Sequence, residues 1–155
     1  MQAATILAQA APRMAGAFYL GRDWTERGNV VRYNSFHDLY GYGMSGGSEY
    51  MGVYMYATPR ASWAVYLDDC ASGTSIYGNV FYRCALTAAH LGGGHDNSFE
   101  NNIVIDCYPP VHMNDRRGNT TTLMRRLEEM NYREPPYAER YPELVRLPVL
   151  AGAQL

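Results

Sequence analysis

The chain has 155 residues, a formal net charge of −2 and 18% charged residues. A chain of this length forms one domain that buries about 70% of the surface it exposes when unfolded. The near-neutral charge argues against a nucleic-acid or anionic-membrane partner bound by bulk charge, and no apolar run reaches the length of about 18 residues that spans a bilayer. All 13 basic residues are arginine, so chemistry that needs a lysine amine is excluded.

The first 14 residues are rich in alanine but lack the basic start of a signal peptide, and glutamines interrupt their apolar part. We interpret this stretch as a first helical turn or cap of the fold. The rest of the chain, with 15 Gly and 14 Tyr in the whole sequence, favours short strands broken by tight turns.

An internal repeat organises the middle of the chain. Residues 31–36, 76–81 and 99–104 align without gaps, and each segment carries an asparagine at its fourth position. The last two segments are 23 residues apart and the first two are 45 apart, close to twice that period. Short apolar strands with an asparagine at a fixed corner predict an all-β fold, a right-handed parallel β-helix of about five coils of 22–23 residues.

Stacked coils turn equivalent residues into ladders along the axis. We expect one ladder of asparagine amides that satisfies backbone groups of the turns. We also expect Cys84 and Cys107 to stack as buried thiols in register with Leu39, because the three cysteines lack metal-binding spacing and form no disulfide scaffold. The expected interior ladders are Val31–Ile76–Phe99 and Phe36–Phe81–Val104.

Two segments depart from the repeat. Residues 44–62 are either an extra coil, with residues 53–55 as its strand, or a long loop over one face. From Asn119 onwards, apolar residues at helical spacing predict an N-capped amphipathic helix, and the proline-rich tail after it is expected to form no regular element and to cover the open end of the stack. The predicted division is therefore a β-helix with its N-terminal cap over residues 1–118, and the helix with its capping tail over residues 119–155.

Acidic and imidazole side chains gather at one register of the predicted coils. A period of 23 aligns Asp69 with Gly92 and Asp115, and it aligns Asp68 with Leu91 and Asn114. Two carboxyls about 5–10 Å apart are what glycoside hydrolysis requires. The expected catalytic residues are Asp68, Asp69 and Asp96, with His90 as a supporting donor. The alternative is that these aspartates only stabilise turns.

The expected substrate-binding residues are polar or aromatic groups near the same register, namely His95, Asp115, Arg116, Tyr54 and Tyr56. The same period places His112 beside Ala89, on the opposite face from His90, which argues against a histidine metal site. We expect no cofactor, although the carboxylates of Asp68, Asp69, Asp96 and Asp115 are suitable ligands for Ca²⁺.

Six segments carry a resemblance to a known family: residues 19–24, 28–38, 65–73, 78–81, 92–97 and 100–107. Here the chain resembles the secreted right-handed parallel β-helix proteins of the pectate-lyase-like superfamily, over about residues 16–118, and its tail at residues 135–144 resembles the corresponding segment of bacterial members. The resemblance implies action on polysaccharides and an extracellular or periplasmic location. Family members usually have several hundred residues, so we expect a short member or a segment.

The pair Asp68–Asp69 followed one coil later by His90 is similar to the polygalacturonase arrangement, although the third acidic residue and the Arg-x-Lys motif of that family have no counterpart. Three interpretations remain open. The first is a polysaccharide-cleaving enzyme, with hydrolysis favoured over elimination because lyases of this fold commonly use Lys or Arg and lysine is absent. The second is a non-catalytic glycan-binding or structural β-helix. The third is a segment of a larger assembly that self-associates through its end coils.

Overall fold

The computed structural model describes residues 5–6, 9–12, 15–21, 24–42, 48–50, 53–55, 62–84, 87–114 and 120–146. Short strands make up most of this part of the chain, and helices follow only at its C-terminal side. The strands are β1 (Thr5–Ile6), β2 (Gln9–Pro12), β3 (Ala15–Gly21), β4 (Asn29–Arg32), β5 (Ser35–Tyr42), β6 (Ser48–Tyr50), β7 (Val53–Met55), β8 (Ser62–Asp68), β9 (Thr74–Tyr77), β10 (Val80–Cys84), β11 (Thr87–Gly92), β12 (Ser98–Glu100), β13 (Ile103–Ile105) and β14 (Val111–Asn114).

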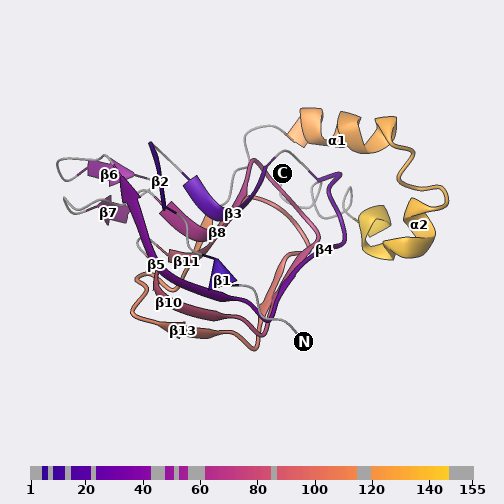
Figure 1. The fold of residues 1–155 in the computed structure, drawn as a ribbon. Coiled ribbons are helices and arrows are strands. Elements are labelled where there is room, and N and C mark those ends of the chain that lie inside the picture. The colour runs from indigo at the N-terminus through magenta and orange to yellow at the C-terminus, as the bar shows by residue number, and fades with distance from the viewer. Residues whose placement is uncertain are drawn as a thin grey trace.

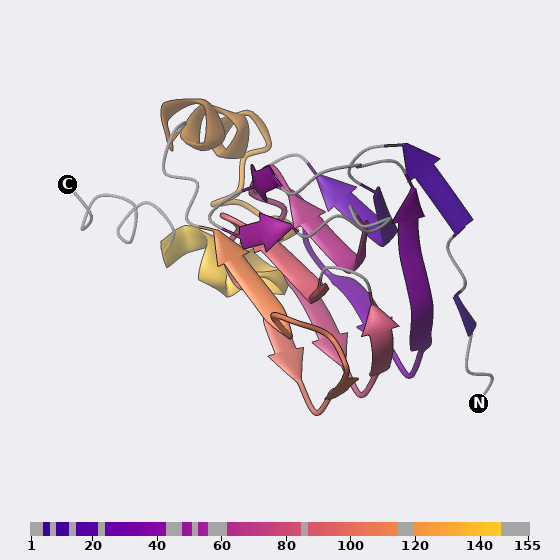
Figure 2. The same cartoon turned by 90° about the vertical axis from the view of Figure 1, so that its left-hand side faces the viewer.

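Three sheets with parallel strand pairing surround one hydrophobic core (Figure 1). Their strand orders are β1-β5-β10-β13, with β2 also on β5, then β14-β11-β8-β3, and β12-β9-β4. The chain therefore visits the three sheets in turn, and Figure 2 shows successive passes side by side from β5 through β10 to β13. This all-β arrangement is compatible with a β-helix-like solenoid.

The predicted interior ladders are confirmed. Ile76 pairs with Val31 on one side and with Phe99 on the other, and Phe81 pairs with Phe36 and Val104. Ile76 and Phe81 are completely buried. Each strand contributes alternate side chains to the core, so apolar residues two apart face inward in every pass.

The asparagine ladder is also confirmed and has a direct physical role. Asn79 Oδ1 accepts hydrogen bonds from the backbone N–H and the side-chain amide of Asn34, both at 3.0 Å. Asn102 Oδ1 accepts the same two hydrogen bonds from Asn79, at 2.9 and 3.0 Å. Asn79 is only 1% exposed, so these bonds satisfy polar groups that water does not reach.

The N-terminal segment and residues 44–62 differ from the expectations. The described N-terminal residues are extended rather than helical, because β1 and β2 pair in parallel with β5. In residues 44–62, β7 pairs antiparallel with β6 in a separate two-stranded sheet. Residues 53–55 are therefore a strand of a hairpin and not of an extra coil.

The predicted amphipathic helix is α1 (Thr120–Glu129), and Asn119, its predicted cap, lies outside the described residues. Two further short helices follow, α2 (Tyr137–Arg140) and the 3-10 helix Pro142–Arg146. The tail thus does form regular elements. Proline fits them because Pro142 occupies a first turn and Pro136 precedes one, where a proline N–H is not needed.

The helices pack beside the sheets, outside the corner between β3 and β4 (Figure 1). Leu123 and Leu127 of α1 join a second hydrophobic cluster with Trp24 and Cys70, which belong to the turns after β3 and β8. These contacts place α1 against the side of the stack, not over its last pass. Among the helices of the described residues, none has the length and apolar character needed to cross a membrane.

Candidate functional site

One three-residue pattern recurs in every strand of the sheet β14-β11-β8-β3. An apolar residue is followed by an aromatic ring or an imidazole and then by a second apolar residue, as in residues 18–20, 65–67, 89–91 and 111–113. The apolar positions belong to the core or pack against it in most strands. Alternation along each strand then sends the middle residues to the outer face of the sheet.

The middle residues form a continuous stack that we call the ring ladder, made of Tyr19, Tyr66, His90 and His112. The ring centroids are 5.1 Å apart between Tyr19 and Tyr66, 5.1 Å between Tyr66 and His90, and 4.8 Å between His90 and His112. Trp63 lies beside the ladder, with its ring centroid 4.3 Å from that of Tyr66. Tyr19 is 51% exposed whereas Tyr66 and His90 are buried, so the ladder opens to solvent at Tyr19.

Asp68 stands next to the ring ladder between two glycines. It pairs with Gly21 on one side, and Gly92 lies on the other. A Cβ atom at Gly21 would lie 2.7 Å from the Tyr19 hydroxyl and 3.4 Å from Asp68 Cβ. A Cβ atom at Gly92 would lie 3.4 Å from both His90 Nε2 and Asp68 Cα. The glycines therefore leave room for a hydroxyl and an imidazole nitrogen to approach Asp68 from both sides.

The two histidines are in direct contact. His90 Nδ1 and His112 Nδ1 are 2.8 Å apart, so one ring donates a proton and the other accepts it. Burial lowers the pKa of His112 below its ordinary value of 6.5, because desolvation disfavours the charged imidazolium. His112 is therefore neutral at neutral pH, which the short contact between the rings requires.

The predicted alignment of this sheet is wrong by one residue. His112 pairs with His90 and not with Ala89, and Leu91 pairs with Leu67, which places Asp68 opposite Gly92. The spacing from β8 to β11 is 24 residues and that from β11 to β14 is 22. A uniform period of 23 therefore separated two histidines that share one face. The repeated pattern of apolar residue, ring and apolar residue is the sequence signal that aligns them correctly.

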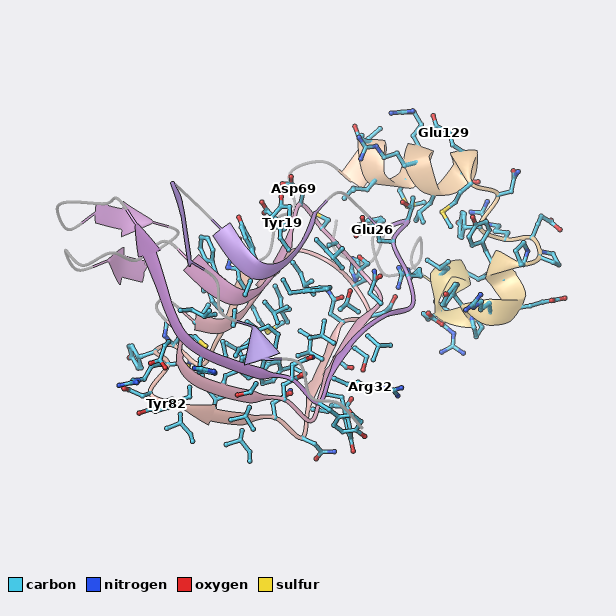
Figure 3. All side chains as sticks on the ribbon, viewed as in Figure 1. Tyr19, Glu26, Arg32, Asp69, Tyr82 and Glu129 are labelled. Carbon is cyan, nitrogen blue, oxygen red and sulfur yellow. The ribbon has the colours of Figure 1, made fainter. Side chains whose placement is uncertain are left out.

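The other predicted catalytic residues lie at the corner after this sheet. Asp69 follows β8 directly, is exposed and has a φ of 45°. Figure 3 shows Asp69 and Tyr19 outside the coil, away from the core. Asp96 forms an ion pair with Arg27, with 2.5 Å between Nη1 and Oδ2. The structure thus brings Asp68 together with His90, whereas Asp96 is held at the corner by an arginine from the turn after β3.

Of the predicted binding residues, His95 packs its ring edge-on against Trp24, with centroids 5.0 Å apart. Tyr54 lies in β7, opposite Glu49. Asp115, Arg116 and Tyr56 lie outside the described residues. Residue-by-residue inspection missed Tyr19, Tyr66 and Trp63, because a tyrosine or tryptophan on a strand has no distinctive signal until its register is known.

The metal expectations concern the same groups. Within the ranges that the structure describes, no group of three or more His, Cys, Asp and Glu side chains is placed to hold a metal ion. The Ca²⁺ ligand set also includes Asp115, which is outside those ranges, and Asp96, which is paired with Arg27.

A pocket of about 380 Å³ lies at the helices, apart from the ring ladder. Its lining residues are Thr25, Arg126, Glu129, Met130 and Tyr137. Arg126 and Glu129 bring opposite charges to it, whereas the ring ladder joins a carboxyl, a hydroxyl and imidazoles on a rigid sheet. The ring ladder is therefore the better place for acid–base chemistry.

We compared the chain with models of protein families, with curated proteins and with solved structures, and none of the three comparisons found a match.

Proposed function

We propose that this chain is a right-handed parallel β-helix of the pectate-lyase-like kind and that it acts on polysaccharides, most directly as a glycoside hydrolase. The observation that carries the proposal is the convergence of the Tyr19 hydroxyl, Asp68 and His90 Nε2 on the outer face of one parallel sheet. The described residues contain three full passes and the start of a fourth, and the number of five coils stays a prediction.

The proposed chemistry divides the work between neighbouring groups. Asp68 and the exposed Asp69 supply the two carboxyls that hydrolysis of a glycosidic bond needs, one as acid and one as base or nucleophile. His90 and the Tyr19 hydroxyl orient Asp68 and the sugar by hydrogen bonds. The half-exposed Tyr19 ring offers a flat amphipathic surface on which a sugar stacks.

The first test is mass spectrometry of soluble products after incubation of the folded chain with a panel of plant, algal and host polysaccharides. Hydrolysis predicts oligosaccharides whose mass includes one added water for each bond cleaved. Products lighter by one water would instead assign a lyase of the same fold. No products from any polysaccharide would overturn the enzyme and favour the glycan-binding or structural alternative.

Variants then locate the site. We expect Asp68→Asn and Asp69→Asn each to reduce turnover at least about 100-fold, a typical contribution of one acid–base group. The matched control is Asp106→Asn, because Asp106 is an exposed aspartate after β13, on a different sheet. Melting temperatures close to that of wild type for the three variants would separate catalysis from a role in the turn. Equal turnover in Asp68→Asn and wild type would contradict the assignment.

A further inference from the structure

Two cysteines meet at the last two passes of the chain. Cys84 ends β10 and pairs with Leu39 of β5, and Cys107 follows β13, which itself pairs with β10. The backbone N–H of Cys84 donates a hydrogen bond to Cys107 Sγ at 3.3 Å. Cys84 is 2% exposed and Cys107 is 9% exposed, so the two sulfur atoms lie together at the edge of the core.

The backbone repeats the same turn at each of these positions. Asp38, Arg83 and Asp106 have φ values of 51°, 50° and 53° and directly precede Leu39, Cys84 and Cys107. Such a left-handed residue turns the side chain that follows it toward the core. The alignment of the two thiols is therefore produced by a conformation repeated in three passes and not by one local contact.

The two thiols also differ in acidity. Hydrogen bonds from Cys84 lower the pKa of Cys107 to about 7, because they stabilise its thiolate. The hydrogen bond to Cys107, together with burial, raises the pKa of Cys84. One sulfur is thus a thiolate at neutral pH, and thiolates are the form of cysteine that oxidants and disulfides attack.

We propose that Cys84 and Cys107 are a redox pair that forms a reversible disulfide between β10 and the segment after β13. Neighbouring strands lie about 4.8 Å apart, within the range of about 4.4–6.8 Å between Cα atoms that a disulfide accepts. Cys107 belongs to the pass that ends in β13, an outer strand of its sheet among the described residues. A small oxidant therefore approaches Cys107 from the end of the stack.

The reaction balances with a hydroperoxide as the oxidant. The Cys107 thiolate attacks one peroxide oxygen, the O–O bond breaks, and the products are a sulfenic acid on Cys107 and hydroxide, which takes up a proton to become water. The Cys84 sulfur then attacks the Cys107 sulfur, loses its proton and releases a second water. The two thiols give up two electrons in total, and hydrogen peroxide is reduced to two waters. A low-molecular-weight disulfide oxidises the pair by exchange and is itself reduced to two thiols.

Trypsin provides a direct test because of where the arginines lie. Cleavage after Arg60, Arg83 and Arg116 yields one peptide of residues 84–116, with both cysteines of the pair, and one peptide of residues 61–83 with Cys70. Cys70 is also buried but belongs to the cluster with Trp24 and α1. Each digest therefore contains an internal control of matched burial.

The wild-type chain is treated with hydrogen peroxide or oxidised glutathione, denatured, alkylated with iodoacetamide and digested. We expect peptide 84–116 to lose the mass of two hydrogen atoms and to take no alkyl group, whereas peptide 61–83 takes one. After reduction with dithiothreitol, peptide 84–116 should take two. Two alkyl groups on that peptide after oxidation, a glutathione adduct that does not resolve, or a link between two chains would each overturn the proposal.

The melting temperature tests whether the bond fits the fold. A disulfide that closes a loop of this length is expected to raise the melting temperature of the oxidised chain by about 5–10 °C over the reduced chain. Cys107→Ala should abolish this difference, and Cys70→Ala should retain it. A lower melting temperature of the oxidised chain would show that the native geometry does not accommodate the bond. The mass measurement needs only wild-type protein, so it stands even where a variant fails to fold.

Discussion

At the scale of single residues, Asn79 is the most heavily used polar group of the turns. Its side chain accepts two hydrogen bonds from Asn34, donates one to the Val31 carbonyl at 2.9 Å and donates another to Asn102. We expect Asn79→Ala to lower the free energy of unfolding by about 2–4 kcal/mol, because several buried groups lose their partners at once. Urea denaturation measures this change.

The matched control for that variant is Asn34→Ala. Asn34 stands one pass earlier in the same ladder, is only partly buried, and its side-chain amide donates to Asn79. We expect a smaller loss, near about 1 kcal/mol. Equal losses for the two variants would mean that the amides act independently and not as a ladder.

His112 connects the ring ladder to pH. Its pKa in the folded chain lies below 6.5 because of burial, so the unfolded chain binds the proton more strongly and acid favours unfolding. The stability that this group protects is therefore complete above about pH 6.5 and is lost as the pH falls toward the lower folded pKa. Urea midpoints measured from about pH 5 to about pH 8 should decline more steeply on the acid side for wild type than for His112→Gln. Identical profiles would exclude His112 as a source of the decline.

At the scale of elements, α1 is held by its apolar face. Leu127 is completely buried in the cluster with Trp24, whereas Arg125 lies on the exposed face and pairs with Glu129. We expect Leu127→Ala to cost about 2–5 kcal/mol of stability and to speed tryptic cleavage within α1. Arg125→Ala should change stability by less than about 1 kcal/mol, since surface ion pairs contribute little. Similar effects of the two substitutions would show that the helix does not depend on this packing.

At the scale of the whole molecule, the stacked phenylalanines join three passes into one core. Phe81 lies between Phe36 and Phe99, with ring centroids 5.0 and 5.7 Å away. We expect Phe81→Ala to lower the free energy of unfolding by about 3–5 kcal/mol, because each neighbouring pass loses packing. Tyr82→Ala is the control, since Tyr82 is the next residue but is exposed on the outer face (Figure 3). Circular dichroism in urea would reveal a contradiction if both variants unfolded at the wild-type midpoint.

Much of the fold could be predicted because its information is local and repeated. The asparagine at position four of three aligned segments located the amide ladder, and the alternation around Ile76 and Phe81 located the interior rows. The column of Leu39, Cys84 and Cys107 followed from the same register. In each case a residue and its equivalent one or two periods later occupy the same backbone conformation, so the pattern along the chain is also a pattern in space.

The candidate site was only partly predictable. Asp68 and His90 were identified from their residue types, but their neighbours Tyr19 and His112 were not. The reason is that the passes differ in length, with 24 residues between paired positions of β8 and β11 and 22 between those of β11 and β14. An error of one residue sends a strand side chain to the opposite face, so a mean period located the core better than it located the outer surface.

The amino-acid sequence alone thus determined the all-β character, the strand ladders and the helix after residue 119, because turn chemistry and hydrophobic alternation are written in neighbouring residues. Only the tertiary structure decided that His90 and His112 touch, that Asp96 belongs to Arg27, and that α1 lies against the corner at Trp24. These contacts join residues far apart in the chain. Their geometry depends on how many residues each turn contributes and on which surface each segment buries, and both are settled by packing in three dimensions.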